Sequence, residues 1–345
     1  MVNDNFHRSG GVPIAIRRIS EAVPGVDFCF AGCERSGLAE YVAWIPKGQF
    51  ERFDLKSSNP ARVLIELRRF SKWFAQQHCD LAHCHHRRLS ALLALTHLPV
   101  LYTSHLAFDY ALWFRLLHPG QMTAVTPSVA TNLRQTTGQP VITCIGNPIQ
   151  FPERPPEIDL AKVRRRAVCV ARLEPIKGHR FLLKAWKALR DRGHEFELDL
   201  VGEGSLRPAL EEQVWRDGMG EIIRFRGFRE DISAILGESL FAVLASANEG
   251  QPTATMEAAA IGRASLLTAV PGSVDLLPPQ RRLRNGLAFG QSNELADALL
   301  EWFTHPEEVV DEGQRFFEFL KMSSDPVVVG REYKALYEQV IAHPL

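Results

Sequence analysis

The sequence has no excess of either charge, no apolar stretch long enough to cross a membrane and no regular spacing of cysteines. Its 345 residues contain 40 Lys and Arg against 40 Asp and Glu, so the overall charge does not favour a nucleic-acid partner. The six cysteines are scattered, and several lie in apolar runs, which indicates buried thiols in a reducing compartment. Because no signal peptide opens the chain, we expect a cytoplasmic protein whose contact with a membrane would be peripheral.

What the chain does contain is a repeated alternation of short apolar runs with amphipathic helical patterns, separated by Gly and Pro turns. This alternation is typical of α/β proteins with parallel sheets. The length suffices for two domains with separate cores. The Pro-rich stretch 151–156 predicts a linker, and the rhythm restarts at Ala167. We expect strands at 26–31, 41–45, 80–86, 99–105, 122–125, 141–145, 167–171, 197–201, 221–225, 240–246 and 264–270.

Two basic features are open to more than one interpretation. The predicted helix 61–76 has an apolar face and a face with Arg62, Arg68, Arg69 and Lys72. Such a helix can lie on an anionic membrane, but more often it covers its own sheet. A short basic run, Lys162 and 164–166, precedes the strand at 167–171, and we expect it to be solvated.

One stretch combines the features of a ligand site, the run 249–262. It follows the apolar run 240–246 and precedes another at 264–270, so it predicts a turn and a helix between two parallel strands. The first N–H groups of that helix, at Thr253, Ala254 and Thr255, lack intrahelical partners and can bind an anion such as a phosphate. Glu249 and Glu257 bracket this end and could accept hydrogen bonds from sugar or ribose hydroxyls. The alternative is a solvated helix that carries two charges.

The order Glu249-Gly250-x-Pro-x4-Glu257-Ala-x-Ala-x-Gly262 resembles the signature of retaining glycosyltransferases of family 4 (glycosyl transferases group 1). The resemblance implies the GT-B architecture, in which two Rossmann-like doubly wound parallel-sheet domains face a cleft. It further implies an acceptor-binding domain at 1–150 and a nucleotide-sugar-binding domain at 151–325. A C-terminal helix at 326–345 would pack back on the first domain. Glu249 would meet the donor sugar, and Glu257 the ribose.

Further motifs extend the resemblance over the second domain. Arg172 and Lys177 fall in a run similar to the family's G-R-L-x-x-x-K-G, with Ala171 in place of the first Gly, and they could neutralise a diphosphate. Gly202 and Gly204 form a second loop that allows close approach of a ligand. The segment 227–232 resembles the one that packs along the nucleotide base, which would place backbone groups of Phe228 and Arg229 beside the base.

The first domain contributes fewer motifs. Gly10 and Gly11 follow the first strand, where the family has a Gly-Gly loop near the diphosphate and the acceptor; a plain tight turn is the alternative. His105 matches the family's T-x-H motif and would touch the donor sugar or the acceptor, unless it is a structural histidine. His83 and His85 should lie on one side of a strand, which makes a metal site hard to assemble from this run alone.

Together these motifs predict a retaining glycosyltransferase that moves a sugar from a nucleotide-diphosphate sugar to a hydroxyl of a glycan or lipid-linked acceptor. Envelope polysaccharide or lipopolysaccharide synthesis is the expected setting, with peripheral contact at the inner membrane. No Asp-x-Asp triplet occurs, so we expect neither a metal nor another cofactor. The alternatives are a nucleotide-sugar epimerase or hydrolase with the same architecture and a catalytically silent partner subunit.

Overall fold

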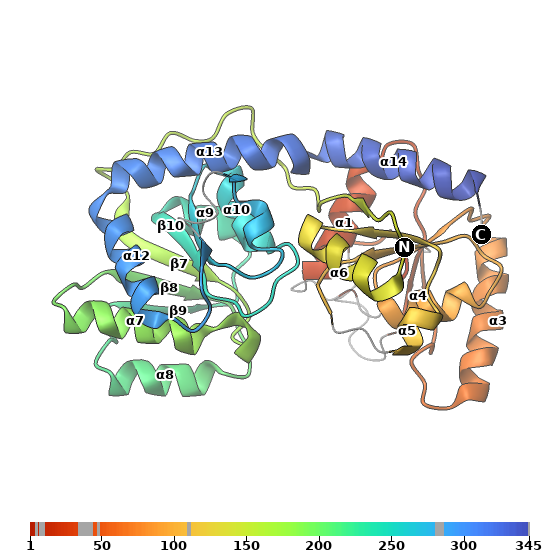
Figure 1. The fold of residues 1–345 in the computed structure, drawn as a ribbon, viewed down its shortest axis with the longest axis horizontal. Helices are drawn as coiled ribbons and strands as arrows, with labels where there is room; N and C mark the ends of the chain where they lie inside the picture. Colours follow the sequence, from red (N-terminus) through yellow and green to blue (C-terminus); the bar gives the residue numbers. More distant parts are fainter. Residues whose placement is uncertain are drawn as a thin grey trace. The chain divides into compact units, whose positions relative to one another are not determined.

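The computed structural model describes residues 1–3, 6, 11–33, 44–46, 49–108, 112–279 and 286–343. The chain divides into two compact units, and Figure 1 labels the helices that belong to them. Unit 1 contains Met1–Pro148 together with Pro326–Leu345, and unit 2 contains Ile149–Asp325. None of the helices in these described ranges combines the length and the hydropathy that a membrane span needs.

Unit 1 is built on parallel strands. Four of them pair in the order β3-β4-β5-β6, with bounds Ala82–Cys84, Val100–Ser104, Gln121–Ala124 and Thr143–Cys144. Two more, β1 (Phe30–Gly32) and β2 (Phe50–Arg52), pair in parallel with each other. Val2 bridges both groups, because it pairs with Ala31 on one side and with Cys84 on the other. All these pairings are parallel, as the βαβ pattern predicts.

Helices of unit 1 bury their apolar stripes against this sheet and against one another. They are α1 (Gly11–Ala22), α3 (Pro60–Gln76), α4 (Arg87–Ala94), α5 (Leu112–Leu116), α6 (Pro127–Thr137) and α14 (Pro326–Ala342). In α3, Leu67, Phe70 and Phe74 are buried, so the apolar face of this basic helix covers its own unit. Helix α14 packs on α1, and a shared buried cluster joins the first and last segments of the chain.

Unit 2 contains a six-stranded sheet in the order β12-β11-β10-β7-β8-β9, and every pairing in it is parallel. The strands are β7 (Arg164–Val170), β8 (Glu197–Val201), β9 (Ile223–Gly227), β10 (Ser239–Leu244), β11 (Ser265–Thr268) and β12 (Gly286–Leu287). The chain thus builds outward from β7 to β9, then returns to β10 beside β7. This reversal is the point at which ligands bind in doubly wound sheets.

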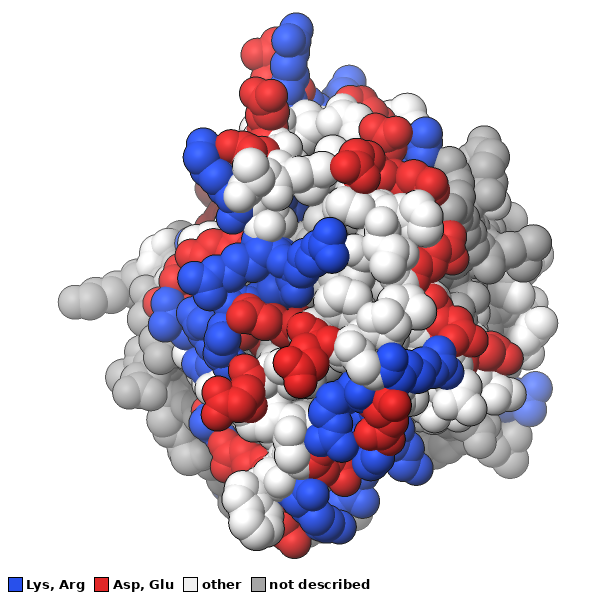
Figure 2. Space-filling model, turned by 90° about the vertical axis from the view of Figure 1, so that its left-hand side faces the viewer, with Lys and Arg blue, Asp and Glu red and all other residues white. Residues whose placement is uncertain are grey.

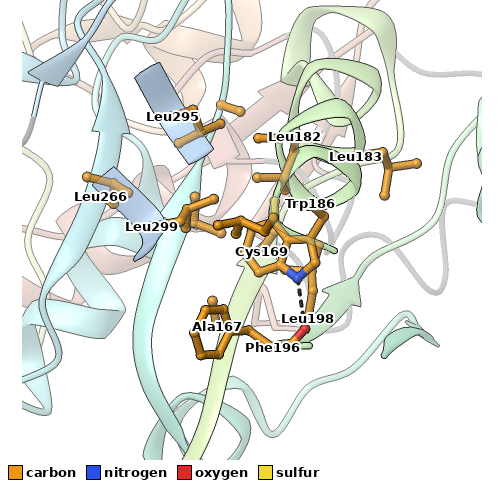
Figure 3. Close-up of a cluster of buried hydrophobic side chains, with 14 of the residues drawn as sticks. Ala167, Cys169, Leu182, Leu183, Trp186, Phe196, Leu198, Leu266, Leu295 and Leu299 are labelled. Atoms are coloured by element: carbon orange, nitrogen blue, oxygen red, sulfur yellow. Dashed lines mark hydrogen bonds between the residues drawn. The ribbon is translucent and has the colours of Figure 1, made fainter. Parts of the chain in front are cut away.

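Helices α7 (His179–Asp191), α8 (Arg207–Arg216), α9 (Ile232–Gly237), α10 (Thr253–Ala260), α12 (Ser292–Thr304) and α13 (Pro306–Ser324) connect these strands or follow them. The largest buried cluster of unit 2 packs α7 and α12 against β7, β8 and β10. At its centre, Trp186 is fully buried and donates its indole N–H to the carbonyl of Phe196 at 3.0 Å (Figure 3). A buried Trp with a satisfied N–H fixes how α7 lies on the sheet.

Strand prediction succeeds where the apolar runs are long and fails at short edge strands. Strand β8 has the predicted bounds, and β10, α10 and β11 follow one another as expected. The predicted strand 26–31 overlaps β1 only at its end. Residues 41–43 of the predicted strand 41–45 lie outside the described residues, and Trp44 and Ile45 form a turn. Strand β2 was not predicted, because three half-buried residues carry too little periodic pattern.

The prediction that the whole basic run at the start of β7 is solvated was wrong for Arg166. Arg164 and Arg165 are exposed, but Arg166 is only 2% exposed. Its guanidinium contacts Glu197 at 2.5 Å and Asp199 at 3.2 Å on the neighbouring strand β8. The charge is buried because β7 and β8 place the three side chains on one face of the sheet.

Basic and acidic side chains are interspersed on the outer surface of unit 2, and some of them form ion pairs. On the face that lies at the left of Figure 1, Lys and Arg side chains stand next to Asp and Glu, as Figure 2 shows. Arg207 is an example, since it contacts Glu211 at 2.8 Å one helical turn along α8. In the chain as a whole, 40 Lys and Arg balance 40 Asp and Glu, so the formal net charge is zero.

Candidate functional site

Loops at the carboxyl edge of the sheet in unit 2 pack so closely that two predicted glycines cannot be replaced. A Cβ on Gly202, after β8, would lie 2.1 Å from the carbonyl oxygen of Ala171, after β7. A Cβ on Gly204 would lie 2.5 Å from the carbonyl oxygen of Leu173. The predicted G-x-G loop is therefore needed for contact between the chain segments that follow β7 and β8.

The segments after β7, β10 and β11 meet at the same edge. A Cβ on Gly178 would lie 1.9 Å from the carbonyl oxygen of Ala245, and the N–H of Ala247 donates to the carbonyl of Ile176 at 2.8 Å. On the other side of β10, a Cβ on Gly272 would come within 2.2 Å of the carbonyl oxygen of Gly250. Gly250 is thus enclosed between neighbouring loops.

Lys177 and Glu249, which are 72 positions apart in the sequence, form an ion pair at this edge. The ammonium nitrogen of Lys177 lies 2.5 Å from Oε1 of Glu249, which is only 6% exposed. Ser246 donates its hydroxyl to the same oxygen at 2.7 Å, and Thr268 on β11 donates to the carbonyl of Ser246 at 2.6 Å. Two donors on Oε1 hold the carboxylate in one orientation, while Oε2 makes no hydrogen bond to the described residues.

Helix α10 begins beside this pair without a side-chain cap. Pro252 precedes the helix, and its carbonyl accepts from the N–H of Thr255 at 3.1 Å. The N–H groups of Thr253 and Ala254 come before the first intrahelical bond, so both are free to bind an anion. Glu257 lies one turn further along and is half-buried. Cation, carboxylate and helix start therefore lie together at the carboxyl edge of the sheet in unit 2.

Arg172 is the second residue after β7 and is exposed, and it makes no ion pair with the described residues. Two residues later, Glu174 accepts hydrogen bonds from the N–H of Ser205 at 3.0 Å and from its hydroxyl at 2.8 Å. These bonds hold the pKa of Glu174 below its usual value. They tie the Arg172 segment to the G-x-G loop, while the Arg172 side chain stays available to a ligand.

The predicted base-contacting residues follow the edge strand β9. Phe228 is 44% exposed, and Arg229 forms a two-pronged ion pair with Asp231, at 2.8 and 2.5 Å. The hydrogen bonds from Arg229 lower the pKa of Asp231. Because its charge is already paired, Arg229 can contribute backbone groups, as the sequence resemblance implies, rather than a free cation.

The remaining predicted residues belong to unit 1. Gly10 lies outside the described residues, and Gly11 is the exposed first residue of α1. His105 follows the carboxyl end of β4, and its Nε2 lies 2.8 Å from Nδ1 of His85. His83 and His85 share one side of the strand, as expected, with ring centroids 4.1 Å apart. Within the described ranges, no group of three His, Cys, Asp or Glu side chains could hold a metal ion.

Comparison with known proteins agrees with this geometry. Residues 164–305, which include β7 to β12, match the family described as glycosyl transferases group 1. Unit 2 contains a group 1 glycosyltransferase domain. In Bacillus subtilis (strain 168), the protein EpsF is 36% identical over 93 residues, which span 27% of this chain and 24% of EpsF.

Solved structures resemble the whole chain and establish the fold around the group 1 domain. HepE (Alr3699) of Anabaena, solved with UDP, superposes with a TM-score of 0.81 over 98% of this chain and 99% of its own, at 16% identity. A glycosyltransferase from Rickettsia africae superposes with a TM-score of 0.79 over 99% and 98% of the two chains, also at 16% identity. The predicted α/β fold of the GT-B glycosyltransferases is thereby confirmed.

Sequence motifs did not reveal three side chains that shape the group 1 domain. Ser246 and Thr268 orient Glu249, and Glu174 joins two loops. The only signal for Ser246 is its position three residues before Glu249, at the end of an apolar run. For Thr268 and Glu174 the partners are distant in sequence, so no local pattern predicts them.

Proposed function

We propose that this chain is a retaining, metal-independent glycosyltransferase. It transfers a sugar from a nucleotide-diphosphate sugar to a hydroxyl group of a glycan or lipid-linked acceptor. The observation that carries the proposal is the Lys177–Glu249 pair beside the uncapped start of α10. The UDP in the HepE structure supports a nucleotide donor for the shared fold.

The two members of the pair suit opposite ends of such a donor. Lys177 carries three N–H donors, of which one binds Glu249, so the others can reach phosphate oxygens. Glu249 keeps Oε2 for sugar hydroxyls. Arg172 and the N–H groups of Thr253 and Ala254 add further positive potential for the diphosphate. In this proposal Glu257 would accept hydrogen bonds from the ribose.

Departure of the nucleoside diphosphate concentrates negative charge at these donors. Preorganised groups that stabilise developing charge contribute about 3 kcal/mol each in well-studied enzymes. In this mechanism cationic side chains of the protein stabilise the leaving diphosphate, as a divalent metal ion does in other transferases. Turnover that is lost with EDTA and restored by Mn²⁺ would contradict it.

The proposal is tested first by donor binding. Thermal unfolding measured with UDP, GDP and ADP, and with their sugars, should show a rise in Tm for one nucleotide series, because a ligand that binds only the folded state stabilises it. Glu257→Ala should abolish most of this rise, whereas Glu212→Ala on exposed α8 should leave it unchanged. No rise with any nucleotide would argue against a nucleotide-sugar site.

The reaction is tested next with the matching nucleotide sugar. Release of the nucleoside diphosphate should require an acceptor, and NMR of the product should show the donor's anomeric configuration. Arg172→Ala should lower turnover about a hundredfold, as expected when one such donor is lost. Equal turnover with and without acceptor would favour a hydrolase or epimerase instead.

The natural acceptor is proposed to be a lipid-linked glycan of envelope polysaccharide synthesis, which brings the protein to the inner membrane from the cytoplasmic side. The basic helix α3 supports this, since Leu64 and Ile65 stay exposed among its Arg and Lys residues. Sedimentation with vesicles of anionic lipid tests the contact. Binding that is unchanged by Leu64→Glu would show that α3 is not the contact.

A further inference from the structure

Three histidines gather where β3 and β4 end in unit 1. The two strands are parallel neighbours, with Cys84 opposite Tyr102, so His85 and His105 both come just after the carboxyl ends. His85 is buried and His105 is half-buried. Nδ1 of His85 lies 2.8 Å from Nε2 of His105, so one of these two nitrogens carries the proton and the other accepts it.

The other ring nitrogen of His85, Nε2, determines which of the two nitrogens carries the proton. Nε2 of His85 lies 3.4 Å from the thioether sulfur of Met1, which can only accept a hydrogen bond. Nε2 of His85 must therefore be protonated, which leaves its Nδ1 as the acceptor. The opposite assignment would set the lone pair of a buried ring nitrogen against the lone pairs of the sulfur, without any proton between them.

The tautomer of His85 determines the tautomer of His105. Because Nδ1 of His85 accepts, Nε2 of His105 donates, and Nδ1 of His105 then has no proton. This atom makes no hydrogen bond to another residue in the part of the chain that the structure describes. Burial lowers the pKa of His105 to about 4, so the ring stays neutral at pH 7 and Nδ1 keeps its lone pair.

His83 does not disturb this arrangement. Its Nε2 lies 2.6 Å from the hydroxyl of Thr103, and its Nδ1 lies 2.8 Å from the hydroxyl of Tyr337 on α14. Both of its nitrogens are thus engaged with hydroxyl groups that can donate or accept. The ring of His83 lies next to that of His85 at a tilt of 39°, but the two rings exchange no hydrogen bond.

We propose that His85 is a positioning residue that holds His105 in the Nε2–H tautomer, so that His105 offers Nδ1 as an acceptor to a substrate hydroxyl. The identity of this hydroxyl, on the donor sugar or on the acceptor substrate, rests on the proposed glycosyl transfer. The assignment of the tautomer does not. A bare nitrogen at this place selects a group that donates a proton, so a hydroxyl is preferred over an ether or a fluorine at the same position.

The tautomer is measured without any substrate. Long-range ¹H–¹⁵N correlation spectra of the protein with labelled histidine distinguish a protonated from a bare ring nitrogen, and the spectrum of His105→Gln assigns the signals. We expect Nε2–H and a bare Nδ1 for His105 at pH 7. A protonated Nδ1 would overturn the proposal even if the protein proves to be a glycosyltransferase.

Two variants of His85 test its role in turnover. His85→Phe removes the acceptor for His105, and kcat/KM should fall about tenfold, the equivalent of one hydrogen bond. His85→Gln keeps an acceptor oxygen and should restore most of the loss. Thermal unfolding shows whether both variants are folded, and the ¹⁵N spectrum should show a mixed tautomer in His85→Phe alone. Full activity in folded His85→Phe, or equal loss in both variants, would contradict the positioning role.

Discussion

The buried pair of Lys177 and Glu249 makes a prediction about stability that does not depend on the reaction. The side chain of Glu249 is 7% exposed and that of Lys177 is 20% exposed. Removing one partner of a fully buried pair costs about 3–5 kcal/mol, because the other charge stays buried without compensation. Since Lys177 keeps some contact with water, we expect Lys177→Met to lower the free energy of unfolding by about 2–3 kcal/mol.

The interaction itself is isolated by a double-mutant cycle. Glu249→Gln should cost less than Lys177→Met, because the amide is neutral and still accepts from Ser246. In the double variant the losses should not add, and the coupling free energy should be roughly 1–3 kcal/mol. Denaturant unfolding followed by Trp fluorescence gives the four values, with any separate transition of unit 2 fitted on its own.

A matched control comes from α7 in the same unit. Lys187 and Asp191 also form an ion pair, but their side chains are 42% and 47% exposed. Their cycle should give a coupling of about 0.5 kcal/mol or less. A coupling free energy for Lys177 and Glu249 that is no larger than the one on α7 would refute the view that these two residues act as one unit.

Three further predictions concern the framework of unit 2. Arg166→Met should lower the free energy of unfolding by about 3–5 kcal/mol, because it takes a buried partner from Asp199; a loss below 1 kcal/mol in chemical denaturation would contradict this. Gly178→Ala should cost several kcal/mol, since the new Cβ meets a carbonyl oxygen, whereas Gly193→Ala at the other end of α7 should cost only about 1–2 kcal/mol for its positive φ. Equal shifts in Tm would show that the close contact does not matter. Burial lowers the pKa of His179 to about 4, so the unfolded chain binds the extra proton as the pH falls below about 6.5, and unfolding at pH 5 should be about 2 kcal/mol easier than at pH 7. His179→Leu should reduce this dependence, and an unchanged slope would remove His179 as its source.

Sequence patterns predicted the parts of the fold in which a local signal and the tertiary structure agree. The run around Glu249 reads as strand, turn, helix and strand because β10 and β11 have apolar centres and are buried throughout, and α10 starts after a proline. The ends of β7, β8 and β10 could then be placed at one edge of a sheet by the rule for parallel strands. That rule is why Lys177 and Glu249 could be expected at one donor site, although the sequence did not predict the ion pair between them.

Long-range contacts set the limit of such prediction. From its local sequence Arg166 is expected to be exposed to solvent, but the pairing of β7 with β8 places Glu197 and Asp199 beside it. The hydrogen bond between His85 and His105 likewise depends on the pairing of β3 with β4, which the sequence around either histidine does not contain.

The course of α14 has a consequence for how the protein is made. The buried cluster in which Ile16 and Ile19 lie also contains Tyr333 and Tyr337. During translation the ribosome releases α1 long before it releases α14, and unit 2 emerges complete in between. The apolar surface of unit 1 therefore stays exposed until the last segment is synthesised. In a chain that stops at Asp325 this surface would remain exposed to chaperones and proteases.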